Sequence, residues 1–139
     1  LAARNENYEN LIKPNLNKKI ILIDRFTDST MAYQHYGFDI NKKIIRDLNN
    51  YILGNFKPNF TFFHFVPPKY IKKNISGKKN KYDKFNKNFY YKVQKGFLNI
   101  LKNNKNKLII DSSKTKKFNI EKVKDKINKV LNINEWIFI

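Results

Sequence analysis

The sequence predicts an α/β fold with a parallel sheet flanked by helices. Short apolar runs rich in β-branched and aromatic residues lie at 20–23, 60–66 and 108–110, and each has the length of a buried strand. Segments with a helical spacing of apolar residues separate these runs, and such alternation indicates βαβ units. We therefore expect one central sheet with strands at roughly those positions (19–24, 60–66 and 107–111) and helices on both faces.

The first half of the chain predicts two helices around the first strand. Residues 1 to about 13 have a helical pattern. After the run at 20–23, Asp28 is placed to cap a helix over about 29–36, because its side-chain oxygen can accept from backbone N–H groups of the first turn. Gly37 would end this helix, since glycine tolerates the backbone conformation of a helix C-terminus.

A third helix and the second strand follow. Asn41 is placed to cap this helix, and Gly54 is placed to end it. Two prolines stop the strand at 60–66, and Pro68 suits the first turn of a helix to about Ser76. The third helix has apolar residues at helical spacing: Ile44, Ile45, Leu48, Ile52 and Leu53.

The second half of the chain predicts two longer helices on either side of the strand at 108–110. The first would run from Asp83 to about Lys102, and the polar stretch 77–83 before it would form an exposed loop. The apolar tail at 136–139 would be a terminal strand or a packing plug. The apolar positions are Phe85, Phe89, Tyr90, Val93, Phe97 and Leu101 in the first helix, and Ile120, Val123, Ile127, Val130 and Leu131 in the second.

Composition excludes several classes of function. The 139 residues contain no cysteine, so neither a disulfide nor a thiolate metal site is possible, and His35 and His64 lack the partner spacing of a metal site. No stretch reaches the apolar length of a membrane span, and no signal-peptide pattern is present. Without a repeat or a linker, we expect a soluble, cytoplasmic protein of one domain.

The net charge of +18 leaves two interpretations open. A strongly basic chain suits a polyanionic partner, such as nucleic acid, an anionic membrane or phosphorylated small molecules. A compositional bias would give the same charge without any binding function. Lysine, asparagine, isoleucine and phenylalanine are used heavily from end to end, as a genome poor in G and C would produce, and the lysines form no single stripe.

The arginines are more informative than the lysines. Only three of the 29 basic residues are arginine, namely Arg4, Arg25 and Arg46. Lysine can replace arginine where a diffuse charge suffices, but not where a planar fork grips a phosphate or a base edge at two points. An arginine retained in so lysine-rich a chain is therefore a candidate binding residue.

Polar residues gather after the first predicted strand, where parallel sheets bind ligands. Asp24 and Arg25 follow the strand directly, and a predicted helix N-terminus comes next. Such a set can hold an anion and hydrogen-bond a polar ring; a surface turn followed by a capped helix is the alternative. The other polar side chains of this region are Ser29, Thr30, Tyr33 and Gln34.

This region resembles the thymidylate kinases. Their signature is Asp-Arg-Tyr/His, a short polar stretch and Ser-Ser/Thr-x-Ala-Tyr-Gln, which residues 24–34 match with Phe26 at the aromatic position. The resemblance implies a P-loop nucleoside monophosphate kinase fold that transfers a phosphoryl group from ATP to dTMP. Further similar stretches follow the family's order: Ala-Ala-Arg at 2–4, Ile-Lys-Pro at 12–14, Gly-Asn-Phe-Lys-Pro-Asn-Phe-Thr at 54–61, Tyr-Asp-Lys-Phe at 82–85 and Leu-Ile-Ile-Asp at 108–111.

The resemblance implies a role for each matching residue. Asp24 would sit near Mg²⁺ and the transferred phosphoryl group, and Arg25 would hold the dTMP phosphate. Arg4 would reach the thymine edge from its helix. The remaining matches would surround the nucleoside: Ser29 and Thr30 at the base pocket, Tyr33 near the deoxyribose, and Gln34 at the base or its neighbours.

The basic loop before the long helix resembles the lid of the family, over about 74–86. One branch of the family places arginines there to stabilise the migrating phosphoryl group, and lysines occupy those places in this chain. The lysines would supply the same charge, or they would form only a solvated basic loop. They are Lys78, Lys79, Lys81 and Lys84.

Motifs of the N-terminal part of the family are missing. No stretch matches the phosphate-binding pattern GxxxxGK[ST], and the chain starts at Leu1 in helical sequence without a cap. We therefore expect residues 1–139 to be the C-terminal portion of a single thymidylate kinase domain, which carries the dTMP-binding half and is inactive alone. The resemblance further implies a homodimer, with neither a membrane nor a specific nucleic acid as partner.

Two other functions remain open from the sequence. Aromatic and basic residues interleave between Lys84 and Lys95, which would suit a nucleic-acid-binding module. The chain could also be a non-catalytic relative or another nucleoside monophosphate kinase. The Ala-Tyr-Gln stretch, with Ser29 and Thr30 before it, favours thymidylate among these kinases.

Overall fold

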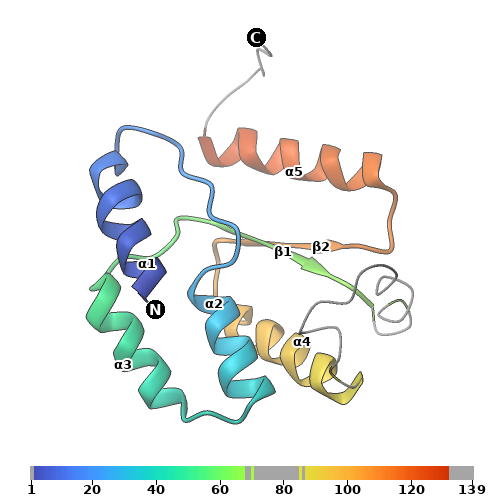
Figure 1. Cartoon of the computed structure of the whole chain (residues 1–139). Helices are drawn as coiled ribbons and strands as arrows, with labels where there is room; N and C mark the ends of the chain where they lie inside the picture. Colours follow the sequence, from blue (N-terminus) through green and yellow to red (C-terminus); the bar gives the residue numbers. More distant parts are fainter. Residues whose placement is uncertain (1, 68–69, 71–84, 86, 132–139) are drawn as a thin grey trace. The chain divides into compact units, whose positions relative to one another are not determined.

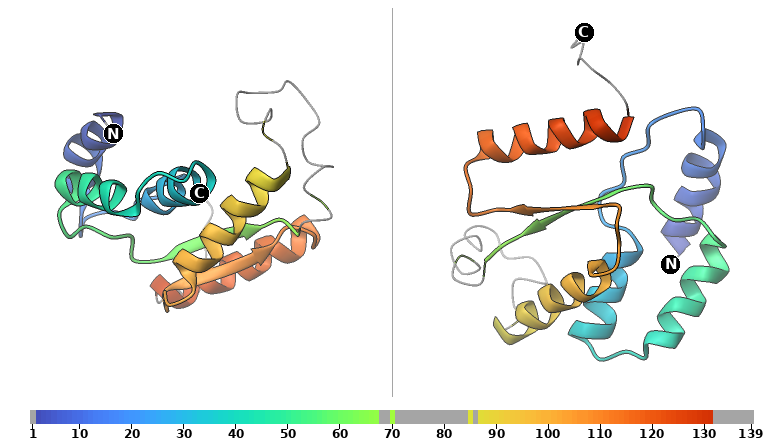
Figure 2. Two further views of the ribbon diagram at one scale, coloured as in Figure 1. Left: turned by 90° about the horizontal axis from the view of Figure 1, so that it is seen from below. Right: turned by 180° about the vertical axis from the view of Figure 1, so that it is seen from behind.

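The structure, a computed structural model, describes residues 2–67, 70, 85 and 87–131 and divides into two compact units (Figures 1 and 2). The first unit comprises Leu1–Pro58 with Phe85–Asn104, and the second comprises Asn59–Lys84 with Lys105–Ile139. No helix in the described part of the chain is long and apolar enough to cross a membrane. The first unit contains every predicted site residue that the structure describes.

The first unit begins with the predicted N-terminal helix. It consists of α1 (Ala2–Asn7), a wider π-helical turn η1 (Tyr8–Ile12) and a final 3₁₀ turn η2 (Lys13–Asn15). Ile12 is buried, and an exposed ion pair of 2.8 Å joins Lys13 to Glu9 one turn earlier. The helical pattern of the sequence is therefore confirmed.

The strand predicted at 20–23 does not form. The segment pairs with no strand among the described residues, and Ile20 and Leu22 are 64% and 88% exposed. A buried parallel strand needs a neighbour to take its backbone hydrogen bonds and cover for both of its faces. The described residues provide neither, so the predicted burial of this apolar run is wrong.

The next helix begins earlier than predicted and is capped differently. It consists of α2 (Thr27–Thr30) and the π-helical η3 (Met31–Gly37). Phe26 occupies the N-cap position, and its carbonyl accepts from the backbone N–H groups of Ser29 and Thr30, at 3.1 and 3.3 Å. Asp28 therefore lies inside the first turn and is not the cap, whereas the predicted end at Gly37 is confirmed.

Helix α3 (Lys42–Leu53) has the predicted ends. The Asn41 side chain accepts from the backbone N–H of Lys43 at 2.8 Å, and Gly54 ends the helix with φ of 55°. Its buried residues are Ile45, Asn49 and Leu53. Two of the predicted apolar positions, Ile44 and Leu48, are exposed instead.

Helix α4 (Lys87–Leu101) packs against η3 and forms the core of the first unit. Ala32, Phe89 and Val93 are its buried centre, which confirms the predicted apolar face of α4. The helices approach closely because Gly96 leaves room for the ring of Tyr36, which a Cβ at that position would meet at 2.6 Å. Partly buried residues surround this centre: Tyr33, Phe85, Tyr90, Phe97 and Ile100.

The second unit contains the sheet. Strands β1 (Thr61–Phe65) and β2 (Lys107–Asp111) pair in parallel, with Phe63 opposite Ile109, and both match the predicted runs. Helix α5 (Lys116–Leu131) runs beside the strands, and the Asn119 side chain donates to the carbonyl of Asp111 at 3.0 Å (Figure 2). No residue of α5 is buried, so its predicted apolar face is covered only in part.

Several predictions lie outside the described residues. These are the helix from Pro68 to Ser76, the loop 77–83, the first turn of the long helix near Asp83, the lid and the tail at 136–139. The two strands that form match two of the three predicted runs.

Candidate active site

Arg4 connects three helices of the first unit. Its Nη1 donates to Asn49 Oδ1 on α3 at 2.7 Å, and its Nη2 donates to Thr30 Oγ1 on α2 at 2.6 Å. The guanidinium carbon also lies over the ring of Phe26, 5.5 Å from its centroid. Two hydrogen bonds from different nitrogens and a ring beneath fix both the position and the plane of the guanidinium.

Burial changes the electrostatics of Arg4. Desolvation lowers the pKa of its guanidinium from its ordinary value, because a half-buried site disfavours the charged form. No carboxylate forms an ion pair with it among the described residues, so neutral acceptors alone satisfy the charge. Such a cation has a strong attraction for an acceptor-rich ligand.

Arg25 has an unusual backbone conformation. Its φ is 58°, in the left-handed region that a residue with a Cβ adopts at a cost of about 1–2 kcal/mol. The side chain lies on Tyr33, with the guanidinium carbon 5.5 Å from the ring centroid and Nη2 3.5 Å from the phenolic oxygen. Strained residues of this kind gather at ligand sites, and the exposed fork of Arg25 remains accessible to a ligand.

Tyr33 is held by the core of the unit. Its ring meets Phe89 and Phe97 edge to face, with centroid distances of 6.1 and 6.4 Å. Gln34 lies in the same π-helical segment, and its backbone carbonyl accepts from Ile40 N at 2.9 Å. Ser29 is half-buried in the first turn of α2. Core rings therefore support Tyr33, and Ser29 and Gln34 lie on the same helix.

The remaining predicted residues are not joined to these contacts. Asp24 is exposed, and its carboxylate has no hydrogen-bond or ion-pair partner in the described part of the chain. That part also holds no cluster of three His, Cys, Asp or Glu side chains that could bind a metal ion. The lid residues Lys78, Lys79, Lys81 and Lys84 lie outside it. The structure therefore gives two groups, one around Arg4 and one around Arg25.

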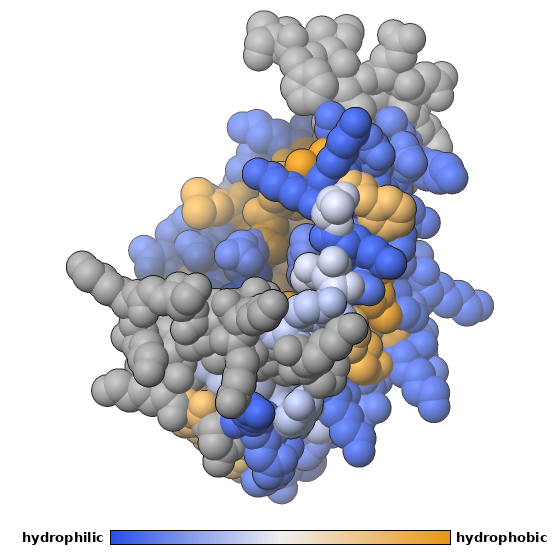
Figure 3. Space-filling model, turned by 90° about the vertical axis from the view of Figure 1, so that its right-hand side faces the viewer, coloured by the Kyte–Doolittle hydropathy of each residue, from blue (hydrophilic) through white to orange (hydrophobic). Residues whose placement is uncertain are grey.

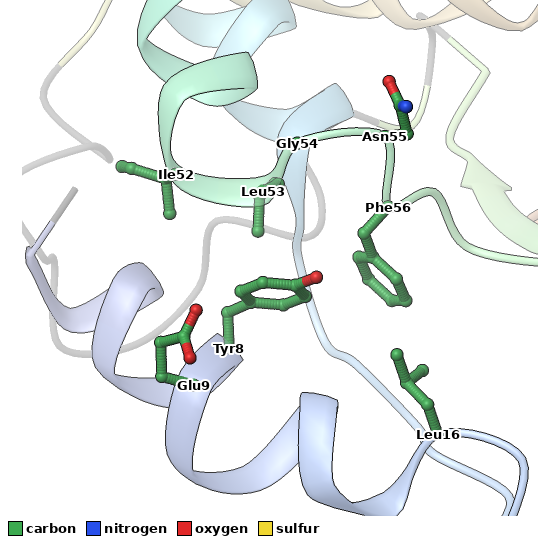
Figure 4. Close-up of a pocket in the computed structure, with 8 residues that line it drawn as sticks. All are labelled: Tyr8, Glu9, Leu16, Ile52, Leu53, Gly54, Asn55 and Phe56. Carbon is green, nitrogen blue, oxygen red and sulfur yellow. The ribbon is translucent and has the colours of Figure 1, made fainter.

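A series of aromatic contacts connects the Arg4 group to a shallow hollow. Phe26 meets Phe56 edge-on at 5.9 Å, and Phe56 meets Tyr8 at 5.4 Å. The hollow has a volume of about 480 Å³, and the side chains of Tyr8 and Phe56 point into it whereas Asn55 points away (Figure 4). Leu16 and Leu53 add apolar lining. The rings of Phe56 and Tyr8, which line the hollow, therefore connect it through Phe26 to Arg4.

Sequence reasoning missed two partners of Arg4. Phe26 was matched to the family's aromatic position without a role, and Asn49 was not considered. A signal for Asn49 was available, because it falls between Ile45 and Leu53 at helical spacing and is a polar residue within an apolar stripe. The aromatic support from Phe56 had no signal, since its contacts depend on the path of the chain after α3.

The comparisons with known proteins agree with these motifs. A family model described as thymidylate kinase matches residues 1–127. The chain belongs to the thymidylate kinase family. It is 34% identical over 137 residues to the thymidylate kinase of Ligilactobacillus salivarius, covering 94% of this chain and 64% of that relative. It is 42% identical over 101 residues to that of Wolbachia pipientis wMel, covering 72% and 50%.

A solved structure is similar as well. The crystal structure of the thymidylate kinase from Ehrlichia chaffeensis matches with a TM-score of 0.66 and 32% identity, covering 94% of this chain and 62% of that chain. This similarity confirms the predicted fold class of the thymidylate kinases, a parallel sheet flanked by helices. This chain of the family spans about half to two thirds of the length of these relatives.

Proposed function

We propose that this chain forms the nucleotide-acceptor part of an enzyme that transfers a phosphoryl group from ATP to dTMP, giving dTDP and ADP. One observation carries the proposal. Two of the three arginines are each held by a residue of the matched signature, Arg4 by Thr30 and Arg25 by Tyr33. Family membership and the names of the relatives support the same conclusion.

The two arginines have different roles in this proposal. Arg25 binds the dTMP phosphate, because its exposed fork can donate two parallel hydrogen bonds to phosphate oxygens. Arg4 binds the edge of the thymine, because its half-buried guanidinium is fixed in one plane and suits a carbonyl acceptor. Ser29 and Thr30 line the base pocket, Tyr33 packs near the deoxyribose, and Gln34 contacts the base or its neighbours.

The residues present fit a magnesium ion that is shared with the substrate. Mg²⁺ in phosphoryl-transfer sites is commonly held by one or two carboxylates together with phosphate oxygens and water. Asp24 offers one exposed carboxylate without a partner among the described residues, next to the proposed phosphate ligand Arg25. When bound, the ion neutralises charge on the phosphates. Asp24 would hold it indirectly, through water and phosphate.

Other parts of the proposal rest on the family alone. Lys78, Lys79, Lys81 and Lys84 would supply positive charge to the migrating phosphoryl group. The 139 residues would be the C-terminal portion of one thymidylate kinase domain that carries the dTMP-binding half. They would not turn over ATP alone, because the pattern GxxxxGK[ST] occurs nowhere in them. A homodimer and a cytoplasmic location stay predictions.

The burial of part of its segment weakens the nucleic-acid-binding alternative. Its aromatic residues lie between Lys84 and Lys95, and Phe89 and Val93 of that segment are the buried centre of the first unit. A stacking platform needs aromatic faces that are open to bases. The exposed ring of Tyr91 and the charge remain in favour of this alternative, and the compositional bias also explains the charge.

Three matched lysine variants test the proposal. The completed enzyme is built by fusing the chain behind the N-terminal portion of a curated relative, and kcat/KM is measured with dTMP and dCMP. Arg25→Lys should lower kcat/KM for dTMP by a factor equivalent to about 1–3 kcal/mol, through loss of the fork. Arg4→Lys should mainly reduce the preference for dTMP over dCMP. Arg46→Lys, at an exposed position of α3, is the control and should change neither.

The outcome separates the proposal from its rivals. If Arg25→Lys and Arg4→Lys both keep the efficiency and base preference of the unchanged enzyme, the assigned roles are wrong. If the completed enzyme phosphorylates no nucleoside monophosphate, the chain is a non-catalytic relative. Binding of the isolated chain to unrelated oligonucleotides with a steep salt dependence would favour the nucleic-acid module.

A further inference from the structure

Asn49 is the only buried polar residue in the described part of the chain. It lies on α3 between Ile45 and Leu53, which are both buried, and it is 8% exposed. Burying an amide is unfavourable unless a hydrogen bond compensates, so a leucine would be the simpler choice for this face. The polar side chain therefore calls for a role that an apolar residue cannot perform.

The partner of Asn49 shows what that role is. Its Oδ1 accepts from Arg4 Nη1 at 2.7 Å, the length of a charge-assisted hydrogen bond. Thr30 Oγ1 takes the second nitrogen of the same guanidinium at 2.6 Å. With one acceptor alone, the guanidinium could rotate about that bond, whereas two acceptors on separate helices hold its plane. Asn49 thus supplies the second anchor of Arg4.

We propose that Asn49 is a positioning residue that holds Arg4 for recognition of the nucleotide base. This inference rests on the function proposed above. A guanidinium has five N–H donors, and the two anchors occupy two of them, so the other three have fixed directions. Fixed donors favour a pyrimidine with a carbonyl at C4 and disfavour one with an amino group there. Asn49 acts on this choice only through Arg4.

The first test observes the guanidinium itself. Because the chain has three arginines, their side-chain nitrogen NMR signals can be assigned with single lysine variants. Arg4 should show slow rotation, with separate Nη signals. Asn49→Leu should restore fast rotation, whereas Asn49→Asp, which keeps an acceptor oxygen, should preserve the slow state. Asn50→Leu makes the same change at the exposed neighbouring position and should leave the signals unchanged.

The second test measures base preference in the completed enzyme. Asn49→Leu should lower the ratio of kcat/KM for dTMP over dCMP by about tenfold, mainly through a higher KM for dTMP. Asn49→Asp should retain the ratio. In an Arg4→Lys background, Asn49→Leu should add no further loss, because its effect passes through Arg4. If the leucine variant unfolds, Asn49→Ser repeats both tests with a side chain too short to reach Arg4.

The two readouts keep the failures apart. If the Arg4 guanidinium still rotates slowly in the Asn49→Leu variant, Asn49 does not anchor Arg4, irrespective of the base preference that the enzyme assay gives. Faster rotation with an unchanged preference for dTMP overturns the link from anchor to recognition and leaves the proposed function standing. If the completed enzyme without any substitution shows no preference for dTMP over dCMP, both the proposed function and this inference are wrong.

Discussion

Asp28 has a half-buried carboxyl group in the first turn of α2. Burial raises its pKa above the usual 3.8, because the charged form loses hydration. A raised pKa in the folded state means that the folded protein binds a proton more readily than the unfolded chain. Deprotonation of Asp28 therefore disfavours folding, and this penalty is fully present at pH values above the raised pKa.

We expect Asp28→Asn to stabilise the chain at neutral pH. The gain in unfolding free energy should shrink as pH falls through the raised pKa and should vanish below about 3.8, the unfolded value. Urea unfolding of both proteins across the acidic to neutral range measures it. Asp47→Asn is the control, since Asp47 is exposed in an ion pair with Lys43 and should cost at most about 1 kcal/mol. A gain independent of pH would contradict the account.

Single residues of the site were predictable when they carried a motif. Arg4, Arg25 and Thr30 stood out by type and order, and the structure joins Arg4 to Thr30. The left-handed backbone of Arg25 could not be predicted, because nothing in the amino-acid type favours it. Asp28 was misplaced because a carboxylate near a helix start is a common cap, whereas Phe26 holds the N-cap position here and makes no side-chain cap hydrogen bond.

At the scale of elements, the contact between α4 and η3 depends on a glycine. Gly96 is buried, and a Cβ there would lie 2.6 Å from ring atoms of Tyr36 and 2.8 Å from its Cβ. Because the Tyr36 Cβ is fixed to the backbone, rotation of the ring alone cannot relieve the clash. The two helices would have to separate, which would loosen the packing under Tyr33.

Gly96→Ala should therefore lower the unfolding free energy by about 1–3 kcal/mol, as overpacked core sites do. The sign of the change in unfolding free energy is informative. At an exposed helix position, alanine is about 1 kcal/mol more favourable than glycine, so the same substitution would stabilise the chain there. Chemical denaturation provides the measurement, with Lys95→Ala at the exposed neighbouring position as the control. Stabilisation by Gly96→Ala would mean that the helices are not in close contact.

The sequence predicted the type of each secondary-structure element better than its burial and pairing. The ends of α3 followed from Asn41 and Gly54, and both strands of the sheet followed from apolar runs. The run at 20–23 is more apolar than either of those strands, yet it pairs with no strand among the described residues. Composition indicates a preference for an extended backbone, but pairing depends on a neighbour that the segment cannot specify.

For the whole molecule, charge is the dominant property. The net charge of +18 reflects 29 basic against 11 acidic residues, and the ion pairs Lys13–Glu9, Lys43–Asp47 and Lys92–Asp39 are all at least partly exposed. Hydrophilic residues cover much of the face shown in Figure 3. Because basic residues far outnumber acidic ones, repulsion among the lysines should disfavour the compact state.

We expect the melting temperature to rise with sodium chloride. The screening length falls from about 30 Å at 0.01 M to about 3 Å at 1 M, so repulsion weakens over this range. Differential scanning fluorimetry follows the change, and potassium chloride should give the same curve if screening is the cause. A melting temperature independent of both salts would show that the positive charges are too far apart to matter.

The overall fold class was predictable because it depends on the alternation of elements, which is a local property of the sequence. The division into two compact units was not, because no glycine- or serine-rich linker marks the boundaries between Pro58 and Asn59 or between Asn104 and Lys105. Contacts between distant segments decide such a division, and a single sequence does not reveal them.

The unpaired segment at 20–23 has a consequence for handling the isolated chain. A run of isoleucine and leucine that pairs with no strand among the described residues can be a template for cross-β assembly, and Leu22 offers an almost fully exposed side chain to a second copy. The charged neighbours Lys18, Lys19, Asp24 and Arg25 flank the run as gatekeepers. High salt would screen these charges, so the conditions that favour the folded state should also favour fibril formation by this segment.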